Sequence, residues 1–329
     1  MNGPDTPFGW HALATTFVWR PGWLLVGVLL LATYLWAARA ARRRGRAVPT
    51  YRIALFVTGV VLLELSVCSA VDAYAMSLFW VHMVQHLMLI TVVPAFLVLG
   101  RPIGTVVDGL SDEPRARAIA VLGSRPARVL AHPVTGISVY AVVIVATHLT
   151  GFMDRMVMHP WLMTFEQVLY LVAGWLMLTS LIGDEPGRAP ASYAARVVGL
   201  LVAMVPDTVV GIVLLQASSN PFPMYGAMRP SWAVDPLHDV NIGGALMWAG
   251  GDGLMMLLGI GVVLVVISSE SRQGDVLGPW LQSARSQHLS TSFTSTLGEE
   301  QPSDLDPDGE DAHEAYNRML RRLQDHEGR

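Results

Sequence analysis

Lysine is absent from this chain of 329 residues, and cysteine occurs once, as Cys68. A single cysteine excludes an intramolecular disulfide and any Cys-x-x-Cys metal site. Charge is also scarce, because charged side chains make up 15% of the residues, against about 25% in a typical soluble domain. Since 52% of the residues are hydrophobic, the composition indicates a protein that crosses a membrane several times.

The sequence also lacks the glycine-rich nucleotide-binding fingerprints and the Gly-x-Ser-x-Gly nucleophile elbow. No nucleophile–base motif is visible elsewhere, so we expect no enzymatic activity. A nucleic-acid partner is not expected either.

Seven apolar segments are each close to the roughly 20 residues that a helix needs to cross a bilayer. They occupy residues 22–38, 53–71, 79–99, 134–150, 161–182, 197–216 and 242–267. The sequence therefore predicts an all-α fold, a bundle of seven transmembrane helices over residues 22–267. Residues 1–21 form an outer N-terminal segment without a basic region, so we expect the first span to be retained rather than cleaved as part of a signal peptide.

Arginine indicates the side of the membrane on which each loop lies, because cytoplasmic loops carry an excess of basic residues. Thirteen arginines fall in the loops after the first, third and fifth spans. Only Arg20, Arg155 and Arg229 fall on the opposite side. This bias predicts that the N-terminus lies outside and the C-terminus inside.

The last segment, residues 268–329, is rich in serine, threonine and acidic residues and poor in large apolar ones. Such a composition cannot bury a core, so we expect a mostly disordered cytoplasmic tail. Tyr316, Met319, Leu320 and Leu323 recur at helical spacing. They allow a short amphipathic helix, although a solvated helix is the simpler interpretation.

The third predicted span opens with two histidines, in the sequence FWVHMVQHLMLITVVPAFLVLGR (Phe79–Arg101). A spacing of four residues puts His82 and His86 on one face of a helix, one turn apart. Ionisable side chains inside a membrane are costly to place and are usually functional. The pair therefore favours a functional site, while the simpler alternative is that each ring only hydrogen-bonds a neighbouring helix.

Polar side chains from most of the spans gather in the outer half of the bilayer once the predicted orientation is applied. Glu64, Cys68 and Asp72 follow one another at intervals of four, so they share one stripe of the second span. No comparable group lies in the inner half. Because scattered structural polar groups would not sort to one side, we expect the functional surface to be the outer one.

Histidine, cysteine and carboxylate side chains are metal ligands, and imidazole together with soft sulfur suits copper, above all Cu(I). The candidate metal-ligating residues are His82, His86, His148, His159, Glu64, Cys68, Asp72, Glu166, His238 and Asp239. Carboxylates can bind a metal directly or orient the imidazoles. Some candidates also have a structural interpretation: Cys68 as a small buried hydrophobe, and Asp239 as a loop charge.

Four segments carry a resemblance to a known family. They are HMVQH with the span that ends PAFLVLGRP (His82–Pro102), ATHLTGFMD (Ala146–Asp154), HPWLMTFEQVLYLVAGWLM (His159–Met177) and DVNIGGALMW (Asp239–Trp248). Their order and spacing resemble the bacterial caa3-type CtaG family of cytochrome c oxidase assembly factors, over residues 10–267. The acidic tail lies outside this resemblance.

The resemblance implies a seven-span protein of the bacterial plasma membrane that is needed to assemble the oxidase. Copper is the implied cofactor, and oxidase subunits or another copper chaperone are the implied partners besides the lipid bilayer. Two positions depart from the family pattern. Glu166 is followed by Gln167, where the family often has an acid–histidine pair, and the last span opens with Asp-Val-Asn (Asp239–Asn241) rather than with glutamine-rich sequence.

Two other functions remain open on the residues alone. A membrane haem b protein could use His82 or His86 with His148 or His159 as axial ligands. A proton or ion transporter could use Glu64, Asp207 and Glu166 as a relay, although the sequence shows no internal repeat of the kind common in transporters.

Overall fold

The computed structural model describes residues 4, 6–186, 192–227 and 229–273, with side chains as far as residue 265. It divides into two units, Met1–Val263 and Leu264–Arg329. Only residues 264–273 of the second unit are described, as the end of the last helix, so the architecture given is that of the first unit. The prediction of a disordered tail falls almost entirely outside the described residues.

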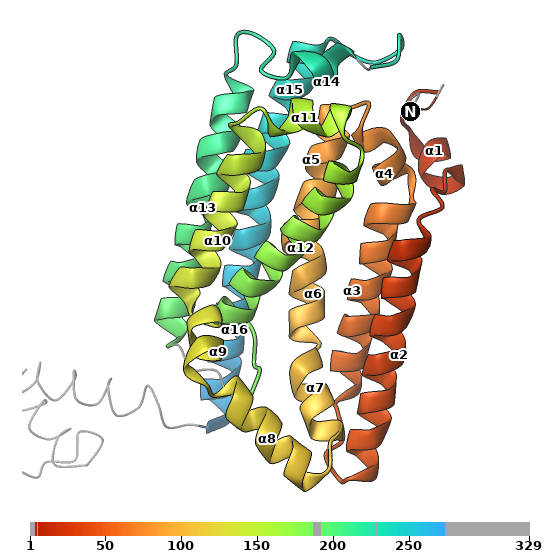
Figure 1. The fold of residues 1–329 in the computed structure, drawn as a ribbon. Coiled ribbons are helices and arrows are strands. Elements are labelled where there is room, and N and C mark those ends of the chain that lie inside the picture. The colour runs from red at the N-terminus through yellow and green to blue at the C-terminus, as the bar shows by residue number, and fades with distance from the viewer. Residues whose placement is uncertain (1–3, 5, 187–191, 228, 274–329) are drawn as a thin grey trace, which may run out of the picture. The chain divides into compact units, whose positions relative to one another are not determined.

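Helices make up most of the described chain (Figure 1). In order they are α1 (Trp10–Thr15), α2 (Pro21–Arg43), α3 (Thr50–Cys68), α4 (Ala70–Ala75), α5 (Phe79–Leu87), the π-helical η1 (Met88–Val92), α6 (Val93–Leu99), α7 (Pro102–Gly109), α8 (Asp112–Leu122), α9 (Arg125–Leu130), α10 (Pro133–His148), α11 (Phe152–Met158), α12 (Trp161–Leu181), α13 (Tyr193–Leu215), α14 (Pro223–Ala227), α15 (Pro236–Ala245), the π-helical η2 (Leu246–Gly250) and α16 (Gly251–Gln273). The described residues form no strand beyond one isolated bridge between Phe17 and Ser69, so the all-α prediction is confirmed for them.

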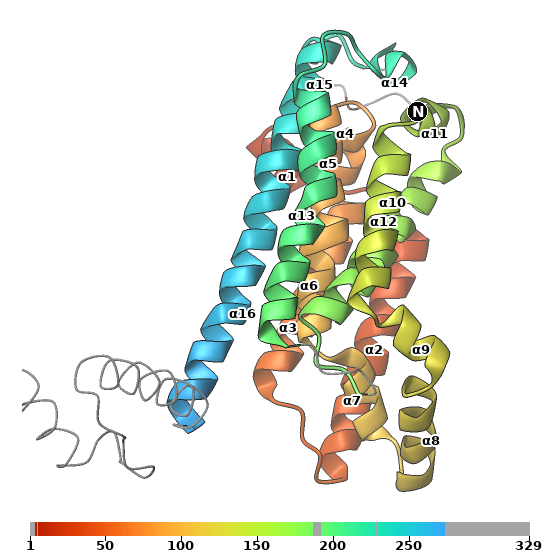
Figure 2. The same cartoon turned by 90° about the vertical axis from the view of Figure 1, so that its left-hand side faces the viewer.

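The long helices of the first unit run side by side, and short helices close both ends of the bundle (Figures 1 and 2). One end carries α1, α4, α11, α14 and the start of α15, and we call it the N-terminal end. The opposite end carries α7, α8 and α9 and the arginine-rich loops, and we call it the arginine end. The predicted orientation puts the N-terminal end outside the cell.

Within the described residues, six helical segments are long and apolar enough to cross a membrane. They are Pro21–Arg43, Thr50–Cys68, Phe79–Gly109, Trp161–Leu181, Tyr193–Leu215 and Pro236–Val265. The predicted span 134–150 corresponds to α10, which is too short by itself and turns by 65° into α11. Counting this bent pair as one span gives seven. The structure thus supports a membrane bundle, with six spans or at most seven.

The N-terminal segment packs onto the bundle instead of extending away from it. The ring of Phe8 meets Tyr74 and Trp80 edge-on, with ring centroids 5.1 Å apart in each pair. The indole of Trp232 donates a hydrogen bond of 3.1 Å to the carbonyl of Pro4. These contacts join the segment to α4, α5 and the loop before α15.

Two π-helical turns interrupt long helices, one directly after α5 and one directly before α16. Such turns are uncommon and often lie at functional sites. At η1 the backbone of α12 comes into direct contact because Gly174 has no side chain. A Cβ atom at Gly174 would lie 1.9 Å from the carbonyl oxygen of Ile90. The glycine therefore allows α12 to pack closely against the helix that carries the two histidines.

At the arginine end, the loop after α12 is bound to the start of α7. Glu185 accepts hydrogen bonds from the N–H groups of Ile103 at 3.2 Å and Gly104 at 2.6 Å, donors that no intrahelical carbonyl can reach. Arg101 has a left-handed backbone, with φ of 54°, and donates to the carbonyl of Asp184 and to the side chain of Asp108. Burial raises the pKa of Glu185 to about 7.

Candidate functional site

Helix α5 begins where Asp239 of α15 caps it. The carboxylate oxygens of Asp239 accept the N–H groups of Phe79 at 2.7 Å and Trp80 at 3.0 Å. This satisfies two donors at the positive end of the helix dipole. Asp239 is therefore a cap on the helix that carries His82 and His86, and both of its oxygens already accept backbone hydrogen bonds.

Four of the candidate residues come together between α5, α10 and α12. The Nε2 atom of His82 lies 3.4 Å from Oε2 of Glu166, and both side chains are 2% exposed. The ring of His86 stands edge-on to that of His148, with centroids 5.0 Å apart. We call His82, His86, His148 and Glu166 the histidine cluster.

Tyr170, one turn after Glu166 on α12, contacts both Glu166 and His86 of the cluster. Its hydroxyl lies 2.7 Å from Oε1 of Glu166 and 3.0 Å from the hydroxyl of Thr147. Its ring also meets His86 edge-on, with centroids 4.4 Å apart. The carboxylate and the histidines are thus held by one buried tyrosine.

The backbone of α10 fixes the orientation of His148. The Nδ1 atom of the ring lies 3.0 Å from the carbonyl of Ile144. The hydroxyl of Thr147 lies 2.9 Å from the same nitrogen. A proton on Nδ1 would satisfy the carbonyl, which can only accept, and would leave the lone pair on Nε2. A backbone carbonyl that orients a metal-binding histidine in this way is common around metal sites. Nε2 of His148 has no hydrogen-bond partner.

Five imidazole nitrogens of the cluster are buried without a hydrogen bond: both of His82, both of His86, and Nε2 of His148. Nε2 of His82 has only the 3.4 Å ion-pair contact with Glu166. Buried polar atoms are normally paired, and imidazole nitrogens are good ligands for copper. The donor chemistry therefore suits a copper ion. Within the described residues, however, no three His, Cys, Asp or Glu side chains are already arranged around a common metal position, so an ion would have to reorient these rings.

Asp72 is engaged in a different set of contacts beside the cluster. Its Oδ2 accepts from the guanidinium of Arg20 at 2.7 Å and 3.0 Å, and its Oδ1 accepts from the amides of Gln85 at 3.1 Å and Gln167 at 2.7 Å. The carbonyl of Gln167 in turn accepts from the indole of Trp23 at 3.0 Å. Asp72 is therefore fully hydrogen-bonded and its charge is neutralised.

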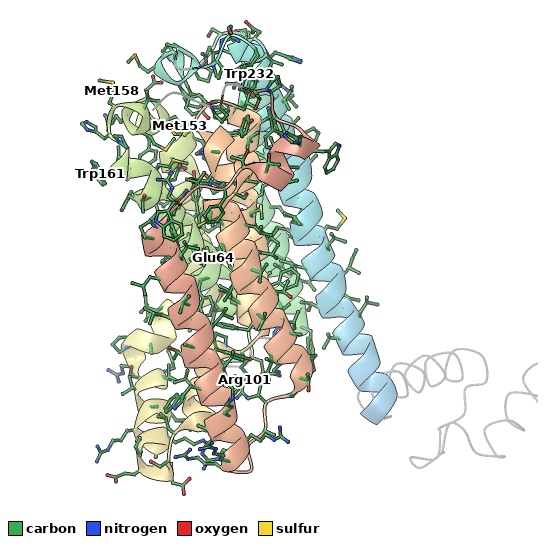
Figure 3. The ribbon with its side chains drawn as sticks, turned by 90° about the vertical axis from the view of Figure 1, so that its right-hand side faces the viewer. Glu64, Arg101, Met153, Met158, Trp161 and Trp232 are labelled. Carbon is green, nitrogen blue, oxygen red and sulfur yellow. The ribbon has the colours of Figure 1, made fainter. Side chains whose placement is uncertain are left out.

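Glu64 and Cys68 pair with each other on α3. The thiol of Cys68 donates to Oε2 of Glu64 at 3.4 Å, while Oε1 of Glu64 is buried without a partner. Glu64 lies against α2 at Gly27, where a Cβ atom would be 2.1 Å from Oε1. Figure 3 shows Glu64 between Trp232, toward the N-terminal end, and Arg101, toward the arginine end.

The two remaining candidates, His159 and His238, lie at helix boundaries and are not buried. The structure gives neither of them a contact with the histidine cluster. The loop arginines predict that both histidines lie in the outer half of the membrane. That depth does not tell whether a side chain faces the interior of the bundle.

Sequence reasoning missed Tyr170, Thr147 and Arg20 as parts of the site, and it treated Gln167 only as a missing ligand. A signal was present for Tyr170, which lies four residues after Glu166 and so on the same helix face. Arg20 and Asp72 are 52 positions apart in the chain, so no local sequence pattern indicates that they pair.

The sequence model of the cytochrome c oxidase caa3 assembly factor family (Caa3_CtaG) matches residues 32–269, which include the whole histidine cluster. The chain belongs to this family. The resemblance predicted from its motifs is thereby confirmed. The family is described as one of cytochrome c oxidase caa3 assembly factors.

Relatives of this Caa3_CtaG chain occur in mycobacteria. Uncharacterized proteins of Mycobacterium bovis and Mycobacterium tuberculosis are each 29% identical to it over 317 residues, and one of Mycobacterium leprae is 27% identical over 317 residues. Each alignment covers 93% of this chain and 44% of the relative, so the chain spans less than half the length of these curated relatives. No solved structure matches it.

Proposed function

We propose that this Caa3_CtaG protein holds Cu(I) in the histidine cluster and hands it on during assembly of cytochrome c oxidase, at the outer face of the plasma membrane. Oxidase subunits or another copper chaperone would be its partners. The observation that supports this most is the set of five buried imidazole nitrogens without hydrogen-bond partners. Copper is then a cargo, which the protein must both take up and release.

Charge favours Glu166 over Asp72 as the anion beside the metal. A monovalent cation in a low-dielectric interior needs a nearby negative charge. Arg20 already neutralises Asp72, whereas Glu166 is contacted by His82 and by the neutral hydroxyl of Tyr170. Metal binding requires neutral imidazoles, so Cu(I) would displace any proton on His82 and take its place beside Glu166.

Two methionines of α11 belong to the hydrophobic core at the N-terminal end of the bundle. Met153 and Met156 of α11 are both 0% exposed, and Figure 3 shows Met153 at that end of the bundle. Thioethers favour Cu(I) over harder cations. Helix α11 is also tied to α14, because Oδ1 of Asp154 accepts the N–H groups of Met224 and Tyr225 at 3.1 and 3.2 Å.

A haem between these histidines fits the geometry less well. His86 is in edge contact with both His148 and Tyr170, at centroid distances of 5.0 and 4.4 Å. The rings of His86 and His148 are perpendicular, with an interplanar angle of 89°. A porphyrin cannot be inserted between rings in such contact without moving the helices apart.

The test is to purify the full chain in mild detergent under reducing conditions and to measure bound copper and the visible spectrum together. We expect copper without the Soret band of a haem protein. Replacing His82, His86 or His148 with glutamine should sharply lower Cu(I) binding and oxidase activity in the cell, because each substitution removes an imidazole while keeping a polar group.

His11→Gln is the matched control, since His11 is an exposed histidine on α1 and should leave copper binding unchanged. Protein abundance is measured for every variant, so that loss of copper can be separated from loss of folding. Normal copper content and normal oxidase activity in the double variant His82→Gln, His86→Gln would refute the proposal.

A further inference from the structure

A second buried polar group lies between α10, α13 and α16. Asp207 follows Pro206 in α13 and is 0% exposed. Its Oδ2 accepts the hydroxyl proton of Tyr140, from α10. Its Oδ1 is buried without any hydrogen-bond partner. An ionised carboxylate in this position would leave one oxygen unsatisfied in the membrane interior, which is unfavourable.

Asp252, the second residue of α16, supplies another acid at the same place. Both of its oxygens accept from the hydroxyl of Thr208, at 3.0 and 2.8 Å. Unlike Asp207, it is only half-buried. Gly251 beside it faces the carboxylate of Asp207, since a Cβ atom there would lie 2.8 Å from Oδ2 of Asp207.

Helix α13 and the π-helical turn η2 are packed backbone to backbone at this point, which brings the two acids together. A Cβ atom at Gly211 of α13 would lie 2.8 Å from the backbone nitrogen of Trp248. Figure 2 shows α13 beside the helix formed by α15 and α16. The wider turn of η2 therefore ends directly beside the buried carboxylate.

The described groups that act electrostatically on Asp207 include no positive charge. The titratable groups that interact with Asp207 are Tyr140 from α10 and Asp252 from α16, and Tyr170 of α12 also interacts with it electrostatically. None of these three carries a positive charge. Two carboxylates that interact in a low-dielectric interior without a cation do not both ionise.

We propose that Asp207 and Asp252 form a proton-binding site inside the bundle, with Asp207 holding the proton and half-buried Asp252 serving as its entrance. A hydronium ion of the surrounding water gives its proton to a carboxylate oxygen of Asp252 and is left as water. Asp252 then passes this proton to Oδ1 of Asp207 and becomes a carboxylate again. One O–H bond is broken and one is formed in that transfer, and the site gains one proton overall. This proposal does not depend on copper handling.

A proton suits the site better than a metal ion. The hydroxyl of Tyr140 directs its hydrogen at Oδ2 of Asp207, which disfavours a cation on that oxygen. Hard metal ions need six or more oxygen ligands, whereas the side chains named here offer few free lone pairs. Loss of the proton would leave two negatively charged carboxylates that repel each other, which would weaken the contact between α13 and α16.

The test is infrared spectroscopy of the full chain in mild detergent, following the C=O stretching band of protonated carboxylic acids. At neutral pH this band should lose intensity in Asp207→Asn and keep it in Asp112→Asn, whose carboxylate is exposed at the arginine end. Asp252→Asn should retain the Asp207 band but slow its shift on transfer into D₂O, because the entrance is removed.

Tyr140→Phe provides a second measurement in case Asp207→Asn does not fold. It removes the hydrogen bond to Oδ2 and keeps both acids, so the band should persist at a shifted frequency. Three results would overturn the proposal: loss of carboxylate rather than carboxylic acid intensity in Asp207→Asn, an unshifted band in Tyr140→Phe, or an unchanged exchange rate in Asp252→Asn.

Discussion

Two buried carboxylates, Glu166 in the histidine cluster and Asp72 next to it, differ in what neutralises their charge. Asp72 is paired with Arg20 and accepts two amide hydrogen bonds. Glu166 has a histidine and a tyrosine as neighbours. A fixed guanidinium leaves an acid little capacity to bind a second cation, whereas a histidine can give up its proton and become a metal ligand. A buried acid therefore serves packing at one position and suits the proposed binding of Cu(I) at the other.

Glu185 makes stability depend on pH at the arginine end. Its pKa rises from 4.5 to about 7 because burial disfavours the carboxylate. Between these two pH values the folded chain holds a proton that the unfolded chain has lost, so stability falls as the pH rises through this window. At one pKa unit per 1.36 kcal/mol, the effect reaches at most roughly 3 kcal/mol. Thermal unfolding in detergent at pH 5 and pH 8 measures it.

Glu185→Gln is the comparison for this effect. The amide cannot ionise, so the variant should show a smaller loss of stability between pH 5 and pH 8 than the unaltered chain. It should also be less stable at pH 5 by about 1 kcal/mol, because an amide nitrogen cannot accept one of the two backbone N–H groups. An equal pH dependence in both proteins would show that another group is responsible.

At the scale of elements, the contact of Gly174 with η1 decides where α12 lies. Gly174→Ala places a methyl group 1.9 Å from a backbone oxygen, and the backbone cannot rotate away as a side chain can. We expect a loss of stability of about 1–3 kcal/mol, typical of overpacked interiors, together with weaker copper binding because Glu166 and Tyr170 lie on α12. Thermal unfolding and copper content measure the two effects.

Gly261→Ala is the matched control. Gly261 also lies in a membrane-spanning helix, but nothing comes within 4 Å of a Cβ atom built there. The added methyl should leave stability unchanged or raise it slightly, because alanine favours a helix over glycine. If both variants behaved alike, the close contact at η1 would not be what positions α12.

Helical periodicity predicted that His82 and His86 share one helix face. The order of the spans and the predicted depth of each residue then placed His148 and Glu166 at the same level of the membrane. Periodicity could not predict η1 or the 65° bend after α10, because both arise from packing against neighbouring helices. The bend is also why the predicted fourth span is not confirmed. Depth carries no information on which way a side chain faces, and for that reason His159 and His238 were grouped with buried residues.

For the molecule as a whole, the arginine distribution predicts the orientation. Reporters fused after Arg46 and Arg128, at the arginine end, should behave as cytoplasmic, because basic loops are retained inside. Reporters fused at Asp154 and Asn220, at the N-terminal end, should behave as external. Alkaline phosphatase and green fluorescent protein fusions give opposite signals on the two sides. A reversed pattern at both ends would place the histidine cluster near the cytoplasmic face.

The hydrogen bond from Trp23 to Gln167 joins residues 144 positions apart, and Asp72 depends on the same glutamine for one of its partners. A ribosome releases α2 and α3 into the membrane long before it has made α12. During that interval Arg20 and Asp72 can pair, but the acceptor that Trp23 has in the folded chain has not yet been made. The polar contacts between α2 and α12 are therefore completed only late in synthesis, and a chain that stalls before α12 leaves Trp23 and Asp72 each without one hydrogen bond of the finished bundle.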